Sequence, residues 1–275
     1  MTLREITEKF ERAGIENAKN DASLIICHFF GISSAALMAD RNKDFSSPEL
    51  DAAVARRCNR EPLQYIIGVW SFMNEEYLVS PHCLIPRSDT ELLCEAVINS
   101  LPQNGRFIDL CTGSGCIGIS ALASRKDATA VAIDLFMDTL EAAKQNAERN
   151  GVSDRINFIQ ADVLDNPPDV LKEKFNIIVS NPPYIRTAVL DDLEPELAFE
   201  PTAALDGGDD GLIFYRKIIE LWSALLSYNG KILFEIGYDQ GEEINGIADK
   251  NGFDCKVFCD AGGNPRIAEL IRKAE

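Results

Sequence analysis

The tetrapeptide Asn181-Pro182-Pro183-Tyr184 constrains this chain more than any other feature of its sequence. It follows an apolar run, residues 175–180, which predicts a buried parallel strand. The tetrapeptide therefore falls just past the carboxyl end of a strand, where open α/β sheets place their ligands. Two successive prolines fix two φ angles and remove two N–H donors, so we expect a stiff ledge at this point.

Such a ledge suits the recognition of a planar NH2 group. The side-chain oxygen of Asn181 and the carbonyl of Pro182 can each accept one N–H, and the ring of Tyr184 can lie against the flat face of the bound group. However, Asn-Pro also opens ordinary turns, and two prolines can simply end a strand. The tetrapeptide alone leaves both interpretations open.

A second motif lies upstream of the ledge. A short apolar strand at residues 106–110 carries Asp109, a glycine turn follows, and residues 117–123 form an apolar helical run. This order is typical of the first unit of a nucleotide-binding βαβ fold. A second strand, residues 129–133, leads into Asp134, which is placed to accept hydrogen bonds from both hydroxyls of a ribose.

The pattern does not fit a dinucleotide, because Asp109 precedes the turn and would repel a pyrophosphate. It fits S-adenosylmethionine, whose sulfonium and ammonium groups are positively charged. We therefore expect the amino acid end of this cofactor to contact Asp109 and the residues of the turn, which are Cys111, Thr112, Gly113, Ser114 and Gly115.

A third strand is predicted at residues 156–159, and Asp162 and Val163 lie beyond its end. The carboxylate of Asp162 can accept a hydrogen bond from the amino group of an adenine, and Val163 can flank the ring. Alternatively, Asp162 merely caps a turn.

With these residues in hand, the chain resembles the release factor glutamine methyltransferases (PrmC/HemK type), which are class I S-adenosylmethionine enzymes. The resemblance covers nearly the whole chain and extends to residues 61–68, 84–91, 199–205 and 208–216. Two positions depart from the family pattern: Cys111 replaces a glycine and Ser88 replaces a proline.

The resemblance implies methylation of the glutamine amide nitrogen in the Gly-Gly-Gln motif of class I peptide-chain release factors, with S-adenosylhomocysteine as the product. Asn181, Pro182 and Tyr184 are the expected catalytic residues, and Asn181 is also expected to contact the cofactor. Because an amide nitrogen is a poor nucleophile, catalysis should come mostly from positioning. Substrate contacts are expected from Asn181, Pro182, Pro183, Tyr184, Arg87 and Glu200.

The expected fold is an α/β, Rossmann-like, doubly wound sheet of the class I methyltransferase type, whose last strand is antiparallel. Residues 1–62 should form a helical bundle that binds the release factor, with one helix starting at Ser47-Pro48. Residues 63–85 should form a β-hairpin linker, and residues 86–275 the methyltransferase domain. His28 is expected in the bundle core.

Charge and composition restrict the partners. The net charge is −17, and residues 86–275 carry 18 basic and 32 acidic side chains, which would repel a DNA duplex. The chain has no apolar stretch long enough to span a bilayer, no signal-peptide core and no cysteine pattern for a metal, so we expect a cytoplasmic protein without metal. The oligomeric state stays open, with a monomer as the default expectation.

Three alternatives remain open at this level. An adenine-N6 DNA methyltransferase can use the same kind of ledge after base flipping. A methyltransferase for glutamine or asparagine of another protein needs the same chemistry. A binding protein that has lost its cofactor is favoured only by Cys111.

Overall fold

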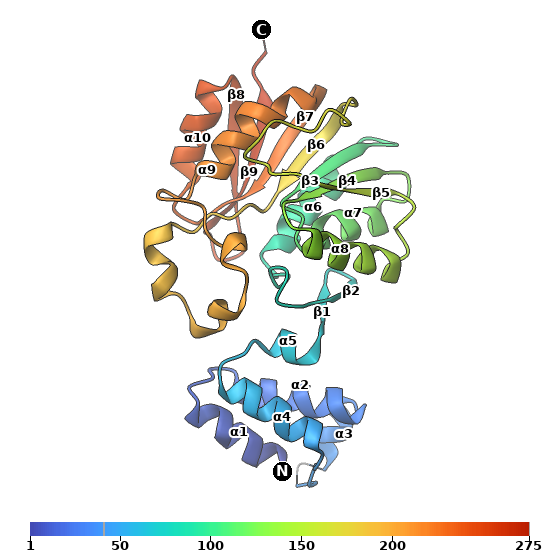
Figure 1. The fold of residues 1–275 in the computed structure, drawn as a ribbon, viewed down its shortest axis with the longest axis vertical. Coiled ribbons are helices and arrows are strands. Elements are labelled where there is room, and N and C mark those ends of the chain that lie inside the picture. Colours follow the sequence, from blue (N-terminus) through green and yellow to red (C-terminus); the bar gives the residue numbers. More distant parts are fainter. Residues whose placement is uncertain (41, 275) are drawn as a thin grey trace. The chain divides into compact units, whose positions relative to one another are not determined.

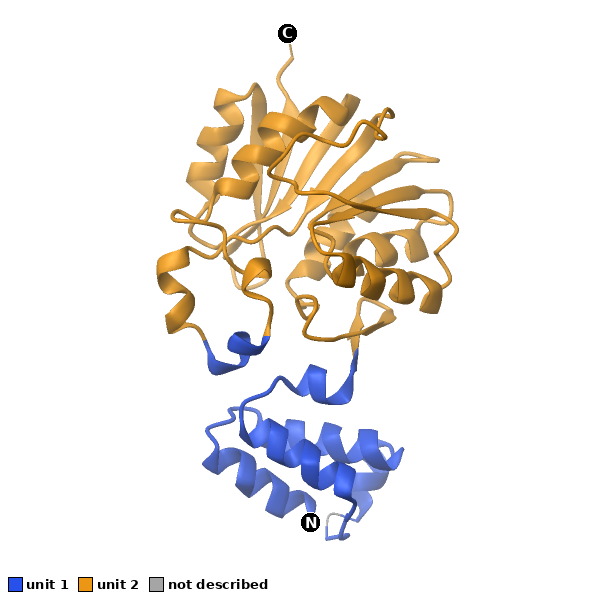
Figure 2. Ribbon diagram, viewed as in Figure 1, with its two compact units in different colours: residues 1–69, 194–199 blue, residues 70–193, 200–275 orange. Residues whose placement is uncertain are grey.

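The computed structural model describes residues 1–40 and 42–274, and the chain divides into two compact units (Figures 1 and 2). Unit 1 comprises Met1–Val69 and the short segment Glu194–Phe199. Unit 2 comprises Trp70–Leu193 and the chain from Glu200 onward. Figure 2 colours the segment 194–199 with the N-terminal residues, although more than a hundred residues separate them in sequence.

Unit 1 is helical. Its helices are α1 (Leu3–Arg12), α2 (Ala18–Phe30), α3 (Ser34–Ala39), α4 (Pro48–Cys58) and α5 (Leu63–Ile67). A capping box between Thr2 and Glu5 starts α1, and the Ser47 side chain caps α4 ahead of Pro48. The predicted helix start at Pro48 is therefore confirmed. Residues 63–67, which we assigned to the linker, form helix α5 and belong to unit 1.

The prediction for His28 is wrong, because the structure exposes this side chain. Its ring stands edge-on to that of Phe29, with the centroids 5.0 Å apart. Position 28 lies at the margin of the buried face of α2, where the imidazole stays hydrated. The core of that face is formed by Ala22, Ile25 and Ile26.

Unit 2 is built on a seven-stranded sheet with the strand order β5-β4-β3-β6-β7-β9-β8. The strands are β3 (Arg106–Leu110), β4 (Thr129–Asp134), β5 (Ile156–Gln160), β6 (Phe175–Ser180), β7 (Leu226–Glu235), β8 (Phe253–Cys259) and β9 (Pro265–Arg272). Strands β3 to β7 pair in parallel, whereas β9 runs antiparallel to both β7 and β8. This topology confirms the predicted fold class, including its antiparallel last strand.

Both faces of the sheet are covered, so its strands are apolar on both sides. Along β6, Ile177 and Val179 face one helical layer and Ile178 faces the other, as the two-residue period of a strand requires. The first layer contains α6 (Thr90–Ser100), α7 (Cys116–Ser124) and α8 (Met137–Arg149). The second contains α9 (Ile213–Lys217), the π-helical turn η4 (Ile218–Trp222) and α10 (Gly241–Lys250) (Figure 1).

Short elements complete the chain. Strands β1 (Val69–Phe72) and β2 (Glu75–Leu78) form a separate two-stranded sheet, as predicted for the hairpin. The 3-10 turns are η1 (Thr187–Asp192), η2 (Pro195–Phe199), η3 (Thr202–Ala204) and η5 (Ser223–Leu225). Among the described helices, none combines the length and the apolar character that crossing a membrane requires.

Candidate active site

A pocket of about 290 Å³ opens in unit 2 at the carboxyl ends of the parallel strands. Its wall includes the segments that follow β3, β4, β5 and β6. This is the edge at which open α/β sheets bind their ligands. The predicted site residues that line it are Arg87, Cys111, Thr112, Gly113, Ser114, Asp134, Asp162, Val163, Asn181 and Pro183. The predicted site residues outside this lining are Asp109, Gly115, Pro182, Tyr184 and Glu200.

Asp134 holds the glycine turn in place. Its Oδ2 accepts the backbone N–H of Gly113 at 3.0 Å, and its Oδ1 accepts that of Phe136 at 3.2 Å. Burial raises the pKa of Asp134, and these backbone hydrogen bonds oppose the rise. Because each carboxylate oxygen has two lone pairs, Asp134 can also accept from the hydroxyls of a ligand in the pocket.

The turn itself requires left-handed backbone angles. The φ angles are +56° at Gly113, +81° at Gly115 and +59° at Cys111. The φ at Gly115 is the one that most favours glycine, and a Cβ there would in addition lie 2.7 Å from Cδ1 of Ile119. A positive φ costs an ordinary L-residue about 1–2 kcal/mol. The departure at Cys111 therefore introduces backbone strain at the pocket wall.

Asp109 lies behind the turn rather than in the pocket. It is fully buried, and its Oδ2 accepts the hydroxyl of Thr112 at 2.6 Å and the N–H of Gly118 at 3.2 Å. Burial raises the pKa of Asp109 to about 7, although both hydrogen bonds lower it. The geometry does not support the expected direct contact with a cofactor. Instead, the carboxylate fastens the glycine turn to the first turn of α7.

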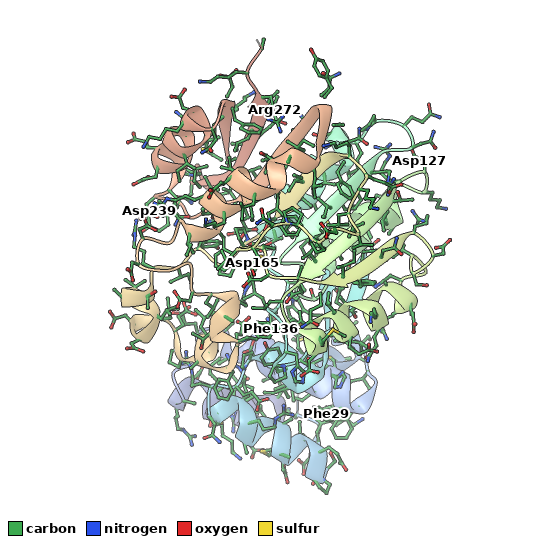
Figure 3. The ribbon with its side chains drawn as sticks, turned by 45° about the horizontal axis from the view of Figure 1, so that its top comes forward. Phe29, Asp127, Phe136, Asp165, Asp239 and Arg272 are labelled. Carbon is green, nitrogen blue, oxygen red and sulfur yellow. The ribbon has the colours of Figure 1, made fainter. Side chains whose placement is uncertain are left out.

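Asp162 and Val163, which follow strand β5, also line the pocket. Asp162 Oδ1 accepts the N–H of Leu164 at 2.8 Å, so this residue does cap a turn. It also lines the pocket, so the cap does not exclude ligand binding. Phe136 borders the same pocket and is 47% exposed (labelled in Figure 3), which provides an apolar surface that sequence reasoning missed.

The charges of the lining suit a cationic ligand. Three carboxylates line the pocket, at Asp134, Asp162 and Asp206. The guanidinium of Arg87 also lines it but pairs with the carboxylate of Glu200. A positively charged sulfonium is favoured in these surroundings, and a phosphate is not.

Glu200 itself lies outside the pocket lining. Its side chain is buried, and it accepts the N–H of Ile85 at 2.9 Å as well as the Arg87 guanidinium. These contacts anchor the loop that precedes α6. Of the two residues predicted to contact the substrate, Arg87 lines the pocket. Glu200 instead holds Arg87 and the backbone of Ile85.

On the ledge, Asn181 is fixed by helix α6. Its Nδ2 donates to Oγ1 of Thr90 at 3.2 Å. Neither the Asn181 Oδ1 nor the carbonyl of Pro182 accepts a hydrogen bond from any described residue. The two acceptors that we expected on the ledge are therefore free, and Asn181 lines the pocket.

Tyr184 is anchored from behind the ledge. Its hydroxyl donates to Oε1 of Glu235 at 3.4 Å, and its carbonyl accepts Nε2 of Gln240 at 3.0 Å. The ring packs against the core layer that contains α9. Backbone bonds between Ile185 and the Leu205–Gly207 segment continue this anchoring. The structure does not bring the ring into the pocket wall.

Sequence reasoning missed three residues that hold the ledge: Thr90, Glu235 and Gln240. Glu235 carried a usable signal, because it ends the apolar strand β7 as Asp134 ends β4. Gln240 carried none, since only the fold brings its amide to the carbonyl of Tyr184.

This fold and pocket define a Rossmann-like methyltransferase domain. A family model described as "Methyltransferase small domain" matches residues 88–206. The crystal structure of a methyltransferase from Pyrococcus furiosus aligns with a TM-score of 0.53 at 18% identity, covering 72% of this chain and 89% of that one. The second likeness concerns the fold alone.

The family follows from the sequence relatives. A model described as "PrmC N-terminal domain" matches residues 2–68. The release factor glutamine methyltransferase of Thermodesulfovibrio yellowstonii is 38% identical over 278 residues, which cover 98% of this chain and 96% of that protein. The one from Geobacter sulfurreducens is 36% identical over 259 residues, covering 92% and 89%. The chain belongs to the family of release factor glutamine methyltransferases, which confirms the resemblance drawn from its motifs.

Proposed function

We propose that this protein transfers a methyl group from S-adenosylmethionine to the side-chain amide nitrogen of the Gly-Gly-Gln glutamine of class I peptide-chain release factors. The observation that carries the proposal is the pair of acceptors on the ledge, Asn181 Oδ1 and the Pro182 carbonyl, which accept no hydrogen bond from the described residues; Asn181 lines the acidic pocket and Pro182 follows it in the chain. Membership of the family supports the choice of substrate.

The ledge makes the poor nucleophile reactive by positioning it. Asn181 and Pro182 each accept one N–H of the glutamine NH2, which directs the nitrogen lone pair away from the ledge. They also stabilise the positive charge that grows on nitrogen as it is alkylated. Orientation of this kind can supply about 7–11 kcal/mol of a reaction barrier. S-adenosylmethionine supplies the methyl group as a substituent of its electrophilic sulfonium, and the extra proton leaves to water.

Different residues of the pocket bind different parts of the cofactor. Asp134 accepts the ribose hydroxyls, Asp162 accepts the adenine amino group, and the turn from Cys111 to Gly115 holds the amino acid end. Asp109 acts through that turn. Tyr184 and Glu200 hold the substrate side of the site without lining the pocket. Tyr184 does so through its hydrogen bond to Glu235, and Glu200 through its ion pair with Arg87.

The N-terminal bundle is proposed to bind the release factor at a surface distant from its glutamine. Residues 2–68 match the family's own N-terminal domain, which supports this division of labour. We propose that the protein acts in the cytoplasm, where its substrate terminates translation, and that it acts as a monomer.

The test compares substrates directly. The protein is incubated with methyl-labelled S-adenosylmethionine and either a class I release factor, the same factor with its Gly-Gly-Gln glutamine replaced by alanine, or duplex DNA. We expect label only in the first reaction. Label in the alanine variant would move the target elsewhere, and label in DNA would favour the adenine methyltransferase.

A further inference from the structure

Asn146 is a fully buried amide on helix α8 that joins the hairpin to the glycine turn. Its Oδ1 accepts the backbone N–H of Leu78 at 2.7 Å, and its Nδ2 donates to the carbonyl of Leu78 at 3.1 Å. The same Nδ2 donates to the carbonyl of Ser114 at 3.0 Å. Leu78 ends strand β2 of the hairpin, whereas Ser114 belongs to the glycine turn and lines the pocket.

The three backbone partners fix the orientation of this amide. An asparagine side chain has one oxygen that accepts and an NH2 group with two protons to donate. The N–H of Leu78 requires the oxygen, and the carbonyls of Leu78 and Ser114 require the two protons. A reversed amide would place its NH2 against an N–H and its oxygen against two carbonyls. Both protons of Asn146 are therefore used within the protein, which makes the residue a rigid link.

The hydrogen bond from Asn146 holds one end of the peptide group between Ser114 and Gly115. The other end of this peptide group, the N–H of Gly115, donates to the carbonyl of Thr112 at 2.9 Å. Gly115 has a φ of +81°, and glycine has the widest choice of backbone angles of any residue. Without the Asn146 donor only one end of the peptide group is held, so the turn can adopt more than one arrangement at the pocket wall.

Tyr77, also on strand β2, makes a second link between the hairpin and the pocket wall. Its hydroxyl lies 3.3 Å from the carbonyl of Cys116 and 2.6 Å from Oγ of Ser120. Ser120 in turn donates to Oε2 of Glu75 at 2.7 Å, because a carboxylate can only accept. The Tyr77 proton is therefore shared between Ser120 and the carbonyl of Cys116. Since Cys116 lines the pocket, the hairpin holds the pocket wall at two residues.

We propose that Asn146 and Tyr77 are positioning residues, through which the hairpin holds the glycine turn in the arrangement that binds S-adenosylmethionine. The inference rests on the proposed function, because it takes the glycine turn to hold the amino acid end of that cofactor. Neither residue lines the pocket, so each acts through the backbone of the segment that does. The hairpin thereby contributes to cofactor binding as well as connecting two parts of the chain.

The first variant is Asn146→Leu, which keeps the approximate size of the side chain and removes its hydrogen bonds. We expect the Kd of S-adenosylmethionine, measured by calorimetry, to rise about 10-fold, the effect of losing one hydrogen bond at an ordered site. At saturating cofactor, kcat and the KM for the release factor should stay near their wild-type values, because the ledge is untouched.

The matched control is Asn150→Leu at the end of the same helix. The Nδ2 of Asn150 donates to the carbonyl of Glu76 on strand β2 at 3.0 Å and to the carbonyl of Asn146 at 3.0 Å. This control therefore loses a contact with the hairpin but keeps the link to Ser114, and its Kd should equal that of the wild type. A rise of the same size in both variants would overturn the role proposed for Asn146.

Tyr77→Phe tests the second link and also serves if Asn146→Leu does not fold. This variant removes only the hydroxyl and keeps the ring, which stands edge-on to Phe72 with the centroids 6.0 Å apart. We expect the Kd of S-adenosylmethionine to rise about 3-fold. The rise is smaller than in Asn146→Leu because the carbonyl of Cys116 receives only a share of the hydroxyl proton.

Hydrogen exchange of the cofactor-free protein supplies a readout that a purely structural role would not produce. In Asn146→Leu, exchange should rise in residues 112–116 and stay at the wild-type level in strand β6, which lies at the centre of the sheet. A general loss of stability would instead raise exchange in both places.

The outcomes separate this inference from the proposed function. Wild-type Kd values in Asn146→Leu and Tyr77→Phe, with unchanged exchange of residues 112–116, would overturn the inference alone. A wild-type protein that binds no S-adenosylmethionine would overturn the proposed function, and the inference with it.

Discussion

The carboxylate of Asp109 accepts the backbone N–H of Gly118 at 3.2 Å, which joins the end of strand β3 to the first turn of α7. A Cβ on Gly118 would lie 3.1 Å from Oδ2 of Asp109, so glycine permits this approach. The other oxygen, Oδ1, is buried and has no hydrogen-bond partner among the described residues. Asp109, the acid that marks the cofactor motif in the sequence, therefore holds β3 and α7 together. Its ionised form is unfavourable in this position, because the carboxylate is buried and one of its oxygens has no hydrogen-bond partner among the described residues.

The first prediction concerns the pH dependence of stability. The pKa of Asp109 is raised from 3.8 to about 7 in the folded state, so between these values the folded protein binds more protons than the unfolded chain. The stability that Asp109 contributes is full below the unfolded pKa and is lost as the pH rises toward 7. The loss in the free energy of unfolding is at most about 4 kcal/mol, and Asp109→Asn should abolish it because an amide does not ionise.

The measurement is urea unfolding of both proteins at pH 5 and pH 8. The free energy of unfolding of Asp109→Asn, relative to wild type, should be higher at pH 8 than at pH 5. An equal difference at the two pH values would show that Asp109 is ionised throughout or does not matter.

The second prediction concerns Cys111, whose φ of +59° strains an L-residue. Cys111→Gly should relieve this strain and leave the free energy of unfolding unchanged or raised by up to about 1 kcal/mol. Binding of S-adenosylmethionine, measured by calorimetry, should be intact or tighter. Cys111→Ala is the matched control, because it removes the sulfur and keeps the Cβ. A large loss of binding in both variants would reveal a role for the thiol.

The third prediction concerns the free acceptor on the ledge. Asn181→Ala removes one of the two groups that hold the substrate NH2, so kcat should fall about 100- to 1,000-fold, as when one oriented group is removed from a transition-state site. Affinity for S-adenosylmethionine should change little. Asn157→Ala on strand β5, where the side chain is exposed, provides the control. Equal turnover in the two variants would refute the ledge mechanism.

The fourth prediction concerns unit 1. Arg57 is 6% exposed and pairs with buried Asp21 at 2.8 Å and with Glu196 at 3.0 Å. Arg57→Ala would leave the Asp21 charge buried without its partner, at a cost of about 3–5 kcal/mol. Hydrogen exchange of helices α2 and α4 should rise accordingly. Arg4→Ala breaks only an exposed pair with Glu8 and should have almost no effect. Similar hydrogen exchange in both variants would contradict the stabilising role of the ion pair between Arg57 and Asp21.

The sequence was informative wherever local order decides structure. An apolar run identified each of strands β3, β4 and β6: a glycine turn follows β3, an acid ends β4, and the Asn-Pro-Pro-Tyr tetrapeptide follows β6. These markers placed Asp134 and Asn181 at one edge of the sheet. Parallel strands bring their carboxyl ends together, so linear order was enough to predict that these residues meet.

The sequence did not predict contacts between distant segments that the sheet topology does not dictate. The segment 194–199 belongs to unit 1 because Glu196 pairs with Arg57 and Arg60, and no local pattern records that pairing. Likewise, a strand pattern predicts that Asp109 is buried near the end of a strand. It does not predict that the carboxylate accepts a hydrogen bond from Thr112 of the glycine turn and lies outside the pocket. The same limit applied to Glu200, which pairs with Arg87 from a distant part of the chain.

The most direct test of the account is a crystal structure with S-adenosylhomocysteine and a Gly-Gly-Gln peptide. We predict that the glutamine NH2 donates one hydrogen bond to Asn181 Oδ1 and one to the carbonyl of Pro182, with its nitrogen facing the sulfur. A glutamine bound with its carbonyl toward Asn181, or held away from Pro182, would contradict the central claim.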